Sequence, residues 1–234
     1  MDVQTEMIEV PPSGGMTCFI ARPTGAARAP GILVIQEAFG LNGHIQDVAR
    51  RIAAEGYVAL APDLYWRAGQ RRTVGYDQIG EAIALMQGVS DKDIVADVGS
   101  AIGYLERQPF VRSDRIGITG FCMGGRVSYL AACELPEKIK ASAPFYGGGI
   151  PIDRTPKLRA PVLAFFGEKD AFIPLDSVEQ LKVELARTGK QAEVIVYPGA
   201  DHGFFCDERA SYQAEAARDA WERLKRFFAT HLQG

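Results

Sequence analysis

The stretch Arg115-Ile-Gly-Ile-Thr-Gly-Phe-Cys-Met-Gly-Gly125 decides how this chain folds. Its first five residues predict a buried strand, and its last six have the spacing Gly-x-nucleophile-x-Gly. In that spacing a Ser or Cys stands on a sharp turn between a strand and a helix, here expected at 123–134, with its side chain exposed. Cys122 occupies the position where Ser is usual. The pattern therefore predicts a nucleophilic thiol, although a buried Cys is more often inert packing.

Strand and helix patterns alternate on both sides of this stretch. Apolar runs typical of strands recur at 31–35, 57–61, 139–143, 162–166 and 192–197. Amphipathic helices are expected between and after them, at 44–55, 77–87, 91–107, 176–188 and 208–231. We also expect an N-terminal hairpin, 8–10 with 16–21 around Pro-Pro-Ser-Gly-Gly, and an exposed loop at 67–76. This order predicts one α/β domain over residues 1–234, with a mostly parallel sheet and helices on both faces.

Composition narrows the class of protein. A chain of 234 residues with 47% hydrophobic residues can bury a core, and a net charge of −3 argues against nucleic acid as a partner. No apolar run is long enough to cross a bilayer, and residues 1–6 do not resemble a signal peptide. The four cysteines lack CxxC spacing and there are only three histidines, so we expect no metal site. These features favour a cytoplasmic enzyme with reduced thiols.

Two further side chains follow later strands in the order nucleophile, acid, base. Asp170 comes after the strand 162–166, and His202 comes after the strand 192–197. Because ligands of open α/β sheets bind at the carboxyl ends of the strands, we expect both to lie near Cys122. His202 would take the thiol proton or pair with the thiolate, and Asp170 would fix the tautomer of the ring. This arrangement is typical of the α/β-hydrolase fold.

Other residues compete for these roles. Glu168 and Asp176 are alternatives to Asp170, which is itself also consistent with a solvated loop carboxylate. Asp201 is adjacent to His202 in sequence and is therefore poorly placed to orient its ring. The remaining histidines are weaker candidates for the base, because one opens a helix and one lies near the chain end: His44 and His231.

The loop after the strand 31–35 reads Gln-Glu-Ala-Phe-Gly (36–40). An oxyanion hole needs the N–H of the residue after the nucleophile, Met123, and a second N–H from this loop, for which we choose Ala38. Glu37 follows a buried strand, where an unpaired carboxylate is costly. It is either a partly solvated loop acid or a group that contacts Cys122 or the substrate.

Four motifs together resemble the dienelactone hydrolases: Gln-Glu-Ala-Phe-Gly (36–40), Ala-Pro-Asp-Leu-Tyr (61–65), Gly-Phe-Cys-Met-Gly-Gly (120–125) and Asp-His-Gly-Phe (201–204). The resemblance implies hydrolysis of an enol lactone to a maleylacetate-like acid in the degradation of catechol-type aromatic compounds. It implies a triad of Cys122, Asp170 and His202, the oxyanion donors Ala38 and Met123, and no metal or organic cofactor. It also implies that Glu37 contacts the thiol at rest and takes its proton when substrate displaces it.

The chain departs from that family at the substrate carboxylate. The best-known members bind it with arginines, one of them shortly after the catalytic histidine, whereas here the first arginine after His202 is Arg209. The variable loop offers a basic cluster from which we choose Arg72, although such loop arginines are often only solvated: Arg67, Arg71 and Arg72. Three aromatic residues are expected to wall the pocket or merely to pack: Tyr146, Phe172 and Phe204.

The expected partner is a small-molecule lactone or ester, with no nucleic acid and no membrane, and the chain is expected to be a monomer or a weak homo-oligomer. A promiscuous small-ester carboxylesterase is the nearest alternative. A peptidase or thioesterase would keep the mechanism and change the substrate. A different class of protein, a binding module whose Cys122 senses redox state, is also compatible with the scaffold.

Overall fold

The structure, a computed structural model, describes residues 1–11, 15–25, 28–69 and 71–234. The chain divides into two compact units, Met1–Gly117 and Ile118–Gly234. The boundary falls inside strand β5 (Val111–Phe121). The single domain expected over 1–234 stays a prediction. Most of the expected hairpin turn lies outside the described residues, as does Gln70 of the expected loop.

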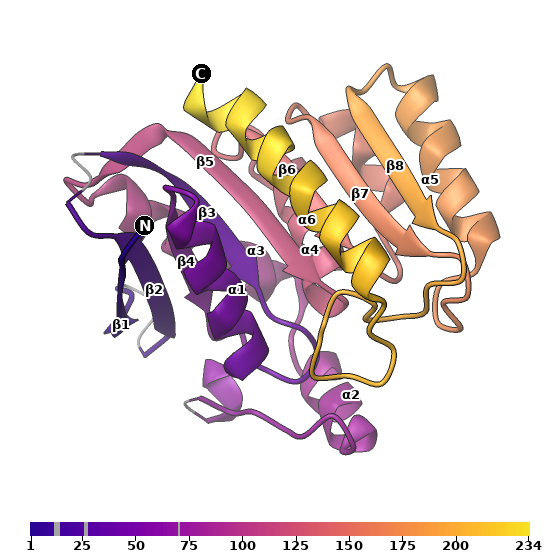
Figure 1. The fold of residues 1–234 in the computed structure, drawn as a ribbon, viewed down its shortest axis with the longest axis horizontal. Coiled ribbons are helices and arrows are strands. Elements are labelled where there is room, and N and C mark those ends of the chain that lie inside the picture. Colours follow the sequence, from indigo (N-terminus) through magenta and orange to yellow (C-terminus); the bar gives the residue numbers. More distant parts are fainter. Residues whose placement is uncertain (12–14, 26–27, 70) are drawn as a thin grey trace. The chain divides into compact units, whose positions relative to one another are not determined.

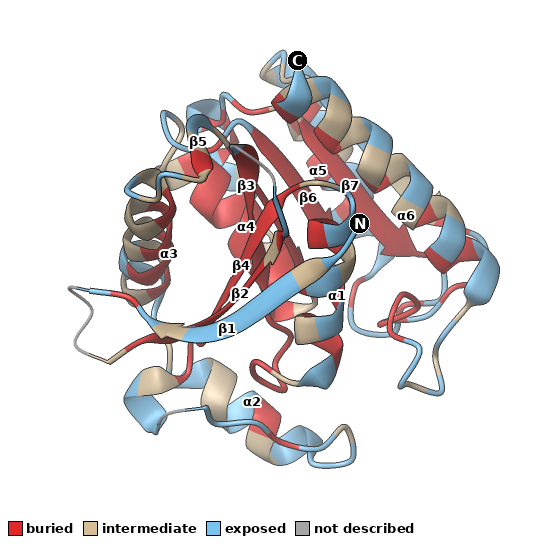
Figure 2. Cartoon of the chain, turned by 60° about the vertical axis from the view of Figure 1, so that its left-hand side comes forward, coloured by how far each residue is buried: buried red, intermediate tan, exposed pale blue. Residues whose placement is uncertain are grey.

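The first unit contains the N-terminal hairpin and two buried strands. β1 (Val3–Glu9) pairs antiparallel with β2 (Thr17–Pro23), which confirms the hairpin. β2 pairs antiparallel with β4 (Val58–Pro62), and β4 pairs in parallel with β3 (Ala29–Ile35). Figure 2 shows β3 and β4 buried along their whole length, whereas β1 is mostly exposed. Continuous burial explains why β3 and β4 read as unbroken apolar runs.

Helices cover both faces of these strands within the first unit. α1 (Gly43–Ala54) lies on one face and α3 (Asp91–Glu106) on the other (Figure 1). Both begin at a capping side chain: the oxygen of Asn42 accepts a hydrogen bond from Ile45 N, and Ser90 caps α3 in the same way. A short 3-10 turn and a more exposed helix lie between β4 and α3: Trp66–Ala68 and α2 (Ile79–Gln87).

Besides the end of β5, the second unit contains three parallel strands in the order β6 (Ala141–Phe145), β7 (Val162–Gly167) and β8 (Ala192–Tyr197). Parallel strands must be joined by crossovers, and here these crossovers are helical. α6 (Ala214–Phe228) lies on one face of the strands (Figure 1). The other face carries two helices, α4 (Met123–Glu134) and α5 (Leu175–Arg187), and the 3-10 segment Ile152–Lys157 precedes β7.

The C-terminal helix starts later than the sequence predicts. The expected helix 208–231 is wrong in its first turns: α6 begins at Ala214, after successive turns over 203–212. These turns end where Gln213 N donates to Phe204 O at 3.0 Å. That long-range bond fixes the start of the helix, and a π-helical turn, Ala229–Gln233, follows its end. Among the described residues, no helix combines the length and the apolarity that crossing a membrane requires.

Candidate active site

Cys122 stands on the sharp turn that its sequence pattern predicts. β5 ends at Phe121 and α4 begins at Met123, which leaves Cys122 between them with φ 56° and ψ −116°. A positive φ is uncommon for a residue with a side chain, and such strain clusters at functional sites. Cys122 N donates to Phe145 O at 3.1 Å, while its carbonyl accepts from Gly125 N at 2.9 Å. The backbone around the half-buried thiol is therefore well held.

Two glycines allow the first turn of α4 to approach the chain after β6. A Cβ atom on Gly125 would overlap the carbonyl oxygen of Phe145 and lie 2.9 Å from Gly147 N. A Cβ atom on Gly147 would lie 2.6 Å from Arg126 N. Larger residues would push the two backbones apart and with them the turn that carries Cys122.

We expect Gly125→Ala to lower the free energy of unfolding by about 2 kcal/mol or more, because its new methyl group meets backbone that cannot yield. Gly99→Ala in α3 is the matched control, since a Cβ atom there meets nothing within 4 Å. We expect this control to raise the free energy of unfolding by about 0.5–1 kcal/mol. Urea denaturation of both variants measures the difference, and a stable Gly125→Ala variant would contradict the close approach.

Asp170 holds the imidazole ring of His202. Nδ1 of His202 lies 2.8 Å from Oδ2 of Asp170, and both side chains are buried. The other carboxylate oxygen accepts from the backbone N–H groups of Phe172, at 2.9 Å, and Ile173, at 3.1 Å. These two donors fix the carboxylate so that its second oxygen faces the ring.

The competing acids make other contacts. Glu168 Oε2 accepts from Gly199 N at 2.8 Å, and Asp201 Oδ1 accepts from the backbone N–H of His202 at 2.6 Å. Asp176 lies in the first turn of α5. Asp170 is therefore the carboxylate that contacts the histidine ring among these candidates.

The surroundings of His202 change its protonation. Burial lowers its pKa, but hydrogen bonds from the ring to Asp170 and Cys122, together with attraction to both groups, outweigh that effect. The pKa of His202 rises to about 9. The ring is therefore an imidazolium at neutral pH, hydrogen-bonded on one side to a carboxylate and on the other to the thiol.

This raised pKa predicts how stability depends on pH. Because folding raises the pKa of His202 from a reference of about 6.5, its contribution to stability is complete below about pH 6.5. It is lost as the pH rises through about 9. The difference in free energy of unfolding between the wild type and His202→Gln should therefore shrink between these two pH values. Urea denaturation across that range tests this, and a difference that stays constant would contradict it.

The loop 36–40, in the first unit, is fixed by the chain that follows β4. The hydroxyl of Tyr65 donates to Ala38 O at 2.9 Å, and the side-chain oxygen of Gln36 accepts from Leu64 N at 3.1 Å. Glu37 is fully buried, and its Oε2 accepts a hydrogen bond from the Tyr76 hydroxyl at 3.2 Å. The peptide groups around Ala38 and the carboxylate of Glu37 are therefore both held in place.

Comparison with known proteins identifies the family. The sequence profile of the dienelactone hydrolase family matches residues 16–232. The chain belongs to the dienelactone hydrolase family. A Synechocystis protein named "Putative carboxymethylenebutenolidase" is 40% identical to it over 246 residues, which cover 100% of this chain and 99% of that protein. A Bradyrhizobium protein named "Probable 2-oxo-3-(5-oxofuran-2-ylidene)propanoate lactonase" is 32% identical, over 92% of this chain and 90% of its own length.

A solved structure supports the same assignment. The crystal structure of a "Putative Dienelactone Hydrolase" from Klebsiella pneumoniae has a TM-score of 0.91 and 36% identity, and the match covers 99% of this chain and 100% of that chain. The prediction of an α/β-hydrolase fold with a mostly parallel sheet is confirmed. The prediction of a carboxylic ester hydrolase is also confirmed, because this family hydrolyses small lactones or esters.

Aromatic side chains surround His202 in this member of the family. The rings of Tyr146 and Phe172 lie edge-on to His202, with centroids 5.1 and 5.2 Å away. Phe204 contacts Tyr146 at 5.4 Å and is fully buried, so it packs behind the first layer. Phe172 is 69% exposed and can meet a ligand from solvent. Contact of these residues with substrate stays a prediction.

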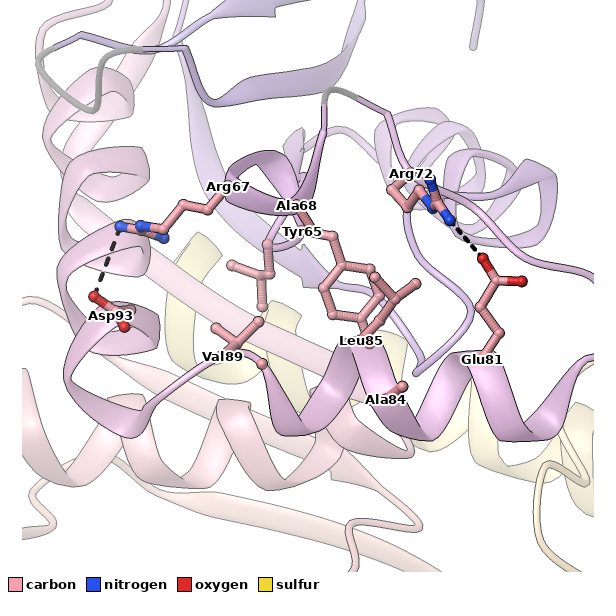
Figure 3. Close-up of a pocket in the computed structure, with 11 residues that line it drawn as sticks. Tyr65, Arg67, Ala68, Arg72, Glu81, Ala84, Leu85, Val89 and Asp93 are labelled. Carbon is pink, nitrogen blue, oxygen red and sulfur yellow. Dashed lines mark hydrogen bonds and ion pairs between the residues drawn. The ribbon is translucent and has the colours of Figure 1, made fainter.

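Two of the loop arginines, Arg67 and Arg72, line a cavity of about 290 Å³ in the first unit (Figure 3). Arg72, the residue chosen from the sequence to bind a substrate carboxylate, pairs with Glu81 at 2.7 Å. Arg67 binds both carboxylate oxygens of the buried Asp97, at 2.6 and 2.9 Å. The walls between them are apolar, with Tyr65, Leu85 and Val89 among the lining residues. Each of these two guanidinium groups therefore already has an acidic partner.

Arg209 lies closer to the histidine than its place in the sequence suggests. Gly203, the residue after His202, has φ 78°, and a Cβ atom there would overlap the guanidinium of Arg209. The turns over 203–212 bring the half-buried guanidinium of Arg209 back to the loop that contains His202. The pairing of a glycine directly after His202 with an arginine six residues on is the signal that sequence reasoning missed.

Proposed function

We propose that this protein opens a dienelactone-type enol lactone through Cys122, His202 and Asp170. The product is a maleylacetate-like acid, and the intermediate is a thioester on Cys122. One observation carries the proposal: a buried carboxylate holds the ring of His202 at 2.8 Å, and that ring is hydrogen-bonded to Cys122, which stands on a strained turn. The names of the relatives supply the substrate class, a lactone.

In the first half-reaction the sulfur of Cys122, a thiolate once Glu37 has taken its proton, attacks the carbonyl carbon of the lactone. A C–S bond forms, and the carbonyl oxygen becomes an oxyanion that the N–H groups of Met123 and Ala38 stabilise. The oxyanion then collapses, the ring C–O bond breaks, and its electron pair leaves with the enol oxygen. His202 donates its proton to that oxygen, which leaves a thioester and a neutral imidazole.

In the second half-reaction water releases the acid. The neutral His202 takes a proton from water, and the resulting hydroxide equivalent attacks the thioester carbonyl. Collapse of this second oxyanion breaks the C–S bond, so Cys122 leaves as a thiolate beside the imidazolium. Asp170 keeps the same ring tautomer through both halves, because Nδ1 remains bound to its carboxylate.

We further propose that Glu37 controls the thiol, as the family resemblance implies. At rest its carboxylate contacts Cys122, and an arriving substrate displaces it. Glu37 then carries away the thiol proton and leaves a thiolate paired with His202. Two observations support this role: Glu37 is fully buried two residues after the end of β3, and a tyrosine hydroxyl holds its carboxylate.

For a substrate carboxylate we propose Arg209, because its guanidinium lies against Gly203, the residue that follows His202. We expect Arg209→Gln to raise KM for an anionic dienelactone by about 10- to 100-fold, the loss typical of a charged hydrogen bond. KM for a neutral aryl ester should stay the same. Arg72→Gln is the matched comparison: if it alone raises KM for the anionic lactone, the carboxylate site is at Arg72, as predicted from the sequence.

A promiscuous small-ester carboxylesterase is the second candidate, favoured by the exposed ring of Phe172 beside His202. Steady-state kinetics with dienelactones and with neutral aryl esters distinguishes the two. The proposal predicts a kcat/KM at least about 100-fold higher for dienelactones, as expected when a charged group adds to binding. Equal values for both substrate classes would favour the carboxylesterase. A role in aromatic compound degradation and a cytoplasmic location remain predictions.

A further inference from the structure

A hydrogen-bonded chain of three side chains ends on Glu37 in the first unit. The hydroxyl of Tyr76 donates to Glu37 Oε2 at 3.2 Å, and Nδ2 of Asn42 donates to the same hydroxyl at 3.0 Å. Asn42 precedes α1, and Tyr76 lies in the segment that leads to α2. Neither residue belongs to a motif that the sequence pattern singles out.

The N-terminus of α1 fixes the direction of this chain. Oδ1 of Asn42 accepts from Ile45 N at 3.1 Å as the helix cap. With its oxygen used there, the amide of Asn42 turns its NH₂ group to Tyr76. The tyrosine oxygen is the acceptor in that bond, so its own proton is directed to Glu37. A helix cap thereby determines that Glu37 receives a hydrogen bond from Tyr76.

The backbone around Tyr76 is attached to the loop that carries Glu37. Val74 N donates to Phe39 O at 3.2 Å, and the rings of Phe39 and Tyr76 meet edge-to-face at 4.7 Å. Gly40, with φ 87°, packs so closely on the backbone of Arg72 that a Cβ atom would overlap its carbonyl oxygen. Tyr76 is therefore a fixed donor rather than a mobile surface residue.

We propose that Tyr76 is a positioning residue that holds Glu37 in its resting place, and that Asn42 orients the Tyr76 hydroxyl for this purpose. The inference rests on the gating role proposed above for Glu37. Tyr76 then sets how readily substrate displaces the carboxylate, and hence how reactive Cys122 is before substrate arrives. Without the hydroxyl, Glu37 leaves the thiol more easily, so the resting thiol becomes more reactive.

The test is the rate at which iodoacetamide alkylates Cys122 without substrate, followed by peptide mass spectrometry. Tyr76→Phe should raise this rate by about 3- to 10-fold, the effect of one neutral hydrogen bond. Asn42→Asp keeps a cap oxygen but replaces the donor with a second acceptor for the tyrosine proton, whereas Asn42→Ser keeps a cap oxygen and simply removes the amide donor without adding a charge. Both should change the rate in the same direction. Tyr212→Phe removes an exposed tyrosine hydroxyl elsewhere and should leave the rate as it is.

A double-mutant cycle with Glu37→Ala separates this inference from the proposed gating. If Glu37→Ala changes the alkylation rate and Tyr76→Phe has no further effect in that background, Tyr76 acts through Glu37. If Tyr76→Phe matches the wild type, or changes the rate equally in both backgrounds, the inference is overturned while the gating stands. If Glu37→Ala itself leaves the rate unchanged, the gating is overturned and the inference with it. Thermal melting of each variant checks that it folds.

Discussion

Replacing Cys122 with Ala is expected to lower kcat for lactone hydrolysis by about 10³-fold or more, the loss typical of removing a nucleophile. The reason is that the C–S bond of the proposed thioester can then no longer form. What remains is stabilisation of a developing oxyanion, which catalyses weakly without a nucleophile. Stopped-flow absorbance of a dienelactone, with the fold checked by circular dichroism, measures the effect.

Cys133→Ala is the control for that loss. Cys133 is fully buried in α4, the same helix that follows Cys122, and it packs in the core. Its truncation changes packing but removes no proposed catalytic group, so kcat should stay within about 3-fold of the wild type. A Cys122→Ala variant with nearly full activity, beside an active control, would mean that another group attacks the lactone.

Replacing Asp170 with Asn is expected to lower kcat by about 10²- to 10⁴-fold. The side chain keeps its size, but an amide can present NH₂ to Nδ1 of His202 and so favour the other ring tautomer. The ring also loses one of the hydrogen bonds that raise its pKa to about 9. In the pH profile of kcat, the group that is protonated in the active enzyme should therefore titrate at lower pH than in the wild type.

Glu168→Gln is the matched control for Asp170→Asn. Both acids lie in the loop after β7, and Glu168 was an alternative acid in the sequence. Its carboxylate binds Gly199 N rather than the ring. We expect Glu168→Gln to change kcat by less than about 5-fold, and a loss as large as that of Asp170→Asn would reassign the acid.

The bounds of several helices and strands could be predicted from the sequence, because apolar periodicity and turn residues within each segment determine them. The helix expected at 123–134 and the strand expected at 192–197 have those bounds in the structure, because apolar periodicity and the glycine turn decide both. The strand expected at 139–143 lies two residues later, at Ala141–Phe145. The start of α6 could not be read in this way, because it depends on the bond from Gln213 to Phe204 across the turns.

The candidate site shows the same division. The order of strands was enough to predict that Asp170 and His202 meet, because the fold brings strand ends to one edge. Tyr76 and Asn42 were missed, and Arg209 was noted only as the first arginine after His202, since the contacts of all three link segments that no motif connects. Tyr76 is 39 positions from Glu37 in the sequence and 34 positions from Asn42, and it is hydrogen-bonded to both. Arg209 contacts Gly203 because irregular turns bring the chain back. Side-chain direction in such turns and loops follows from tertiary packing rather than from sequence spacing.

The most direct test of the account is to stop the reaction during turnover and find where the lactone is attached. Because opening a lactone releases no leaving group, the proposed thioester should add the whole mass of the lactone to the peptide that contains Cys122. This adduct should form and decay at the rate of turnover, and hydroxylamine should remove it. An adduct that resists hydroxylamine would be a thioether, and an adduct on another residue would be a different acyl-enzyme. Either result would contradict the proposed mechanism.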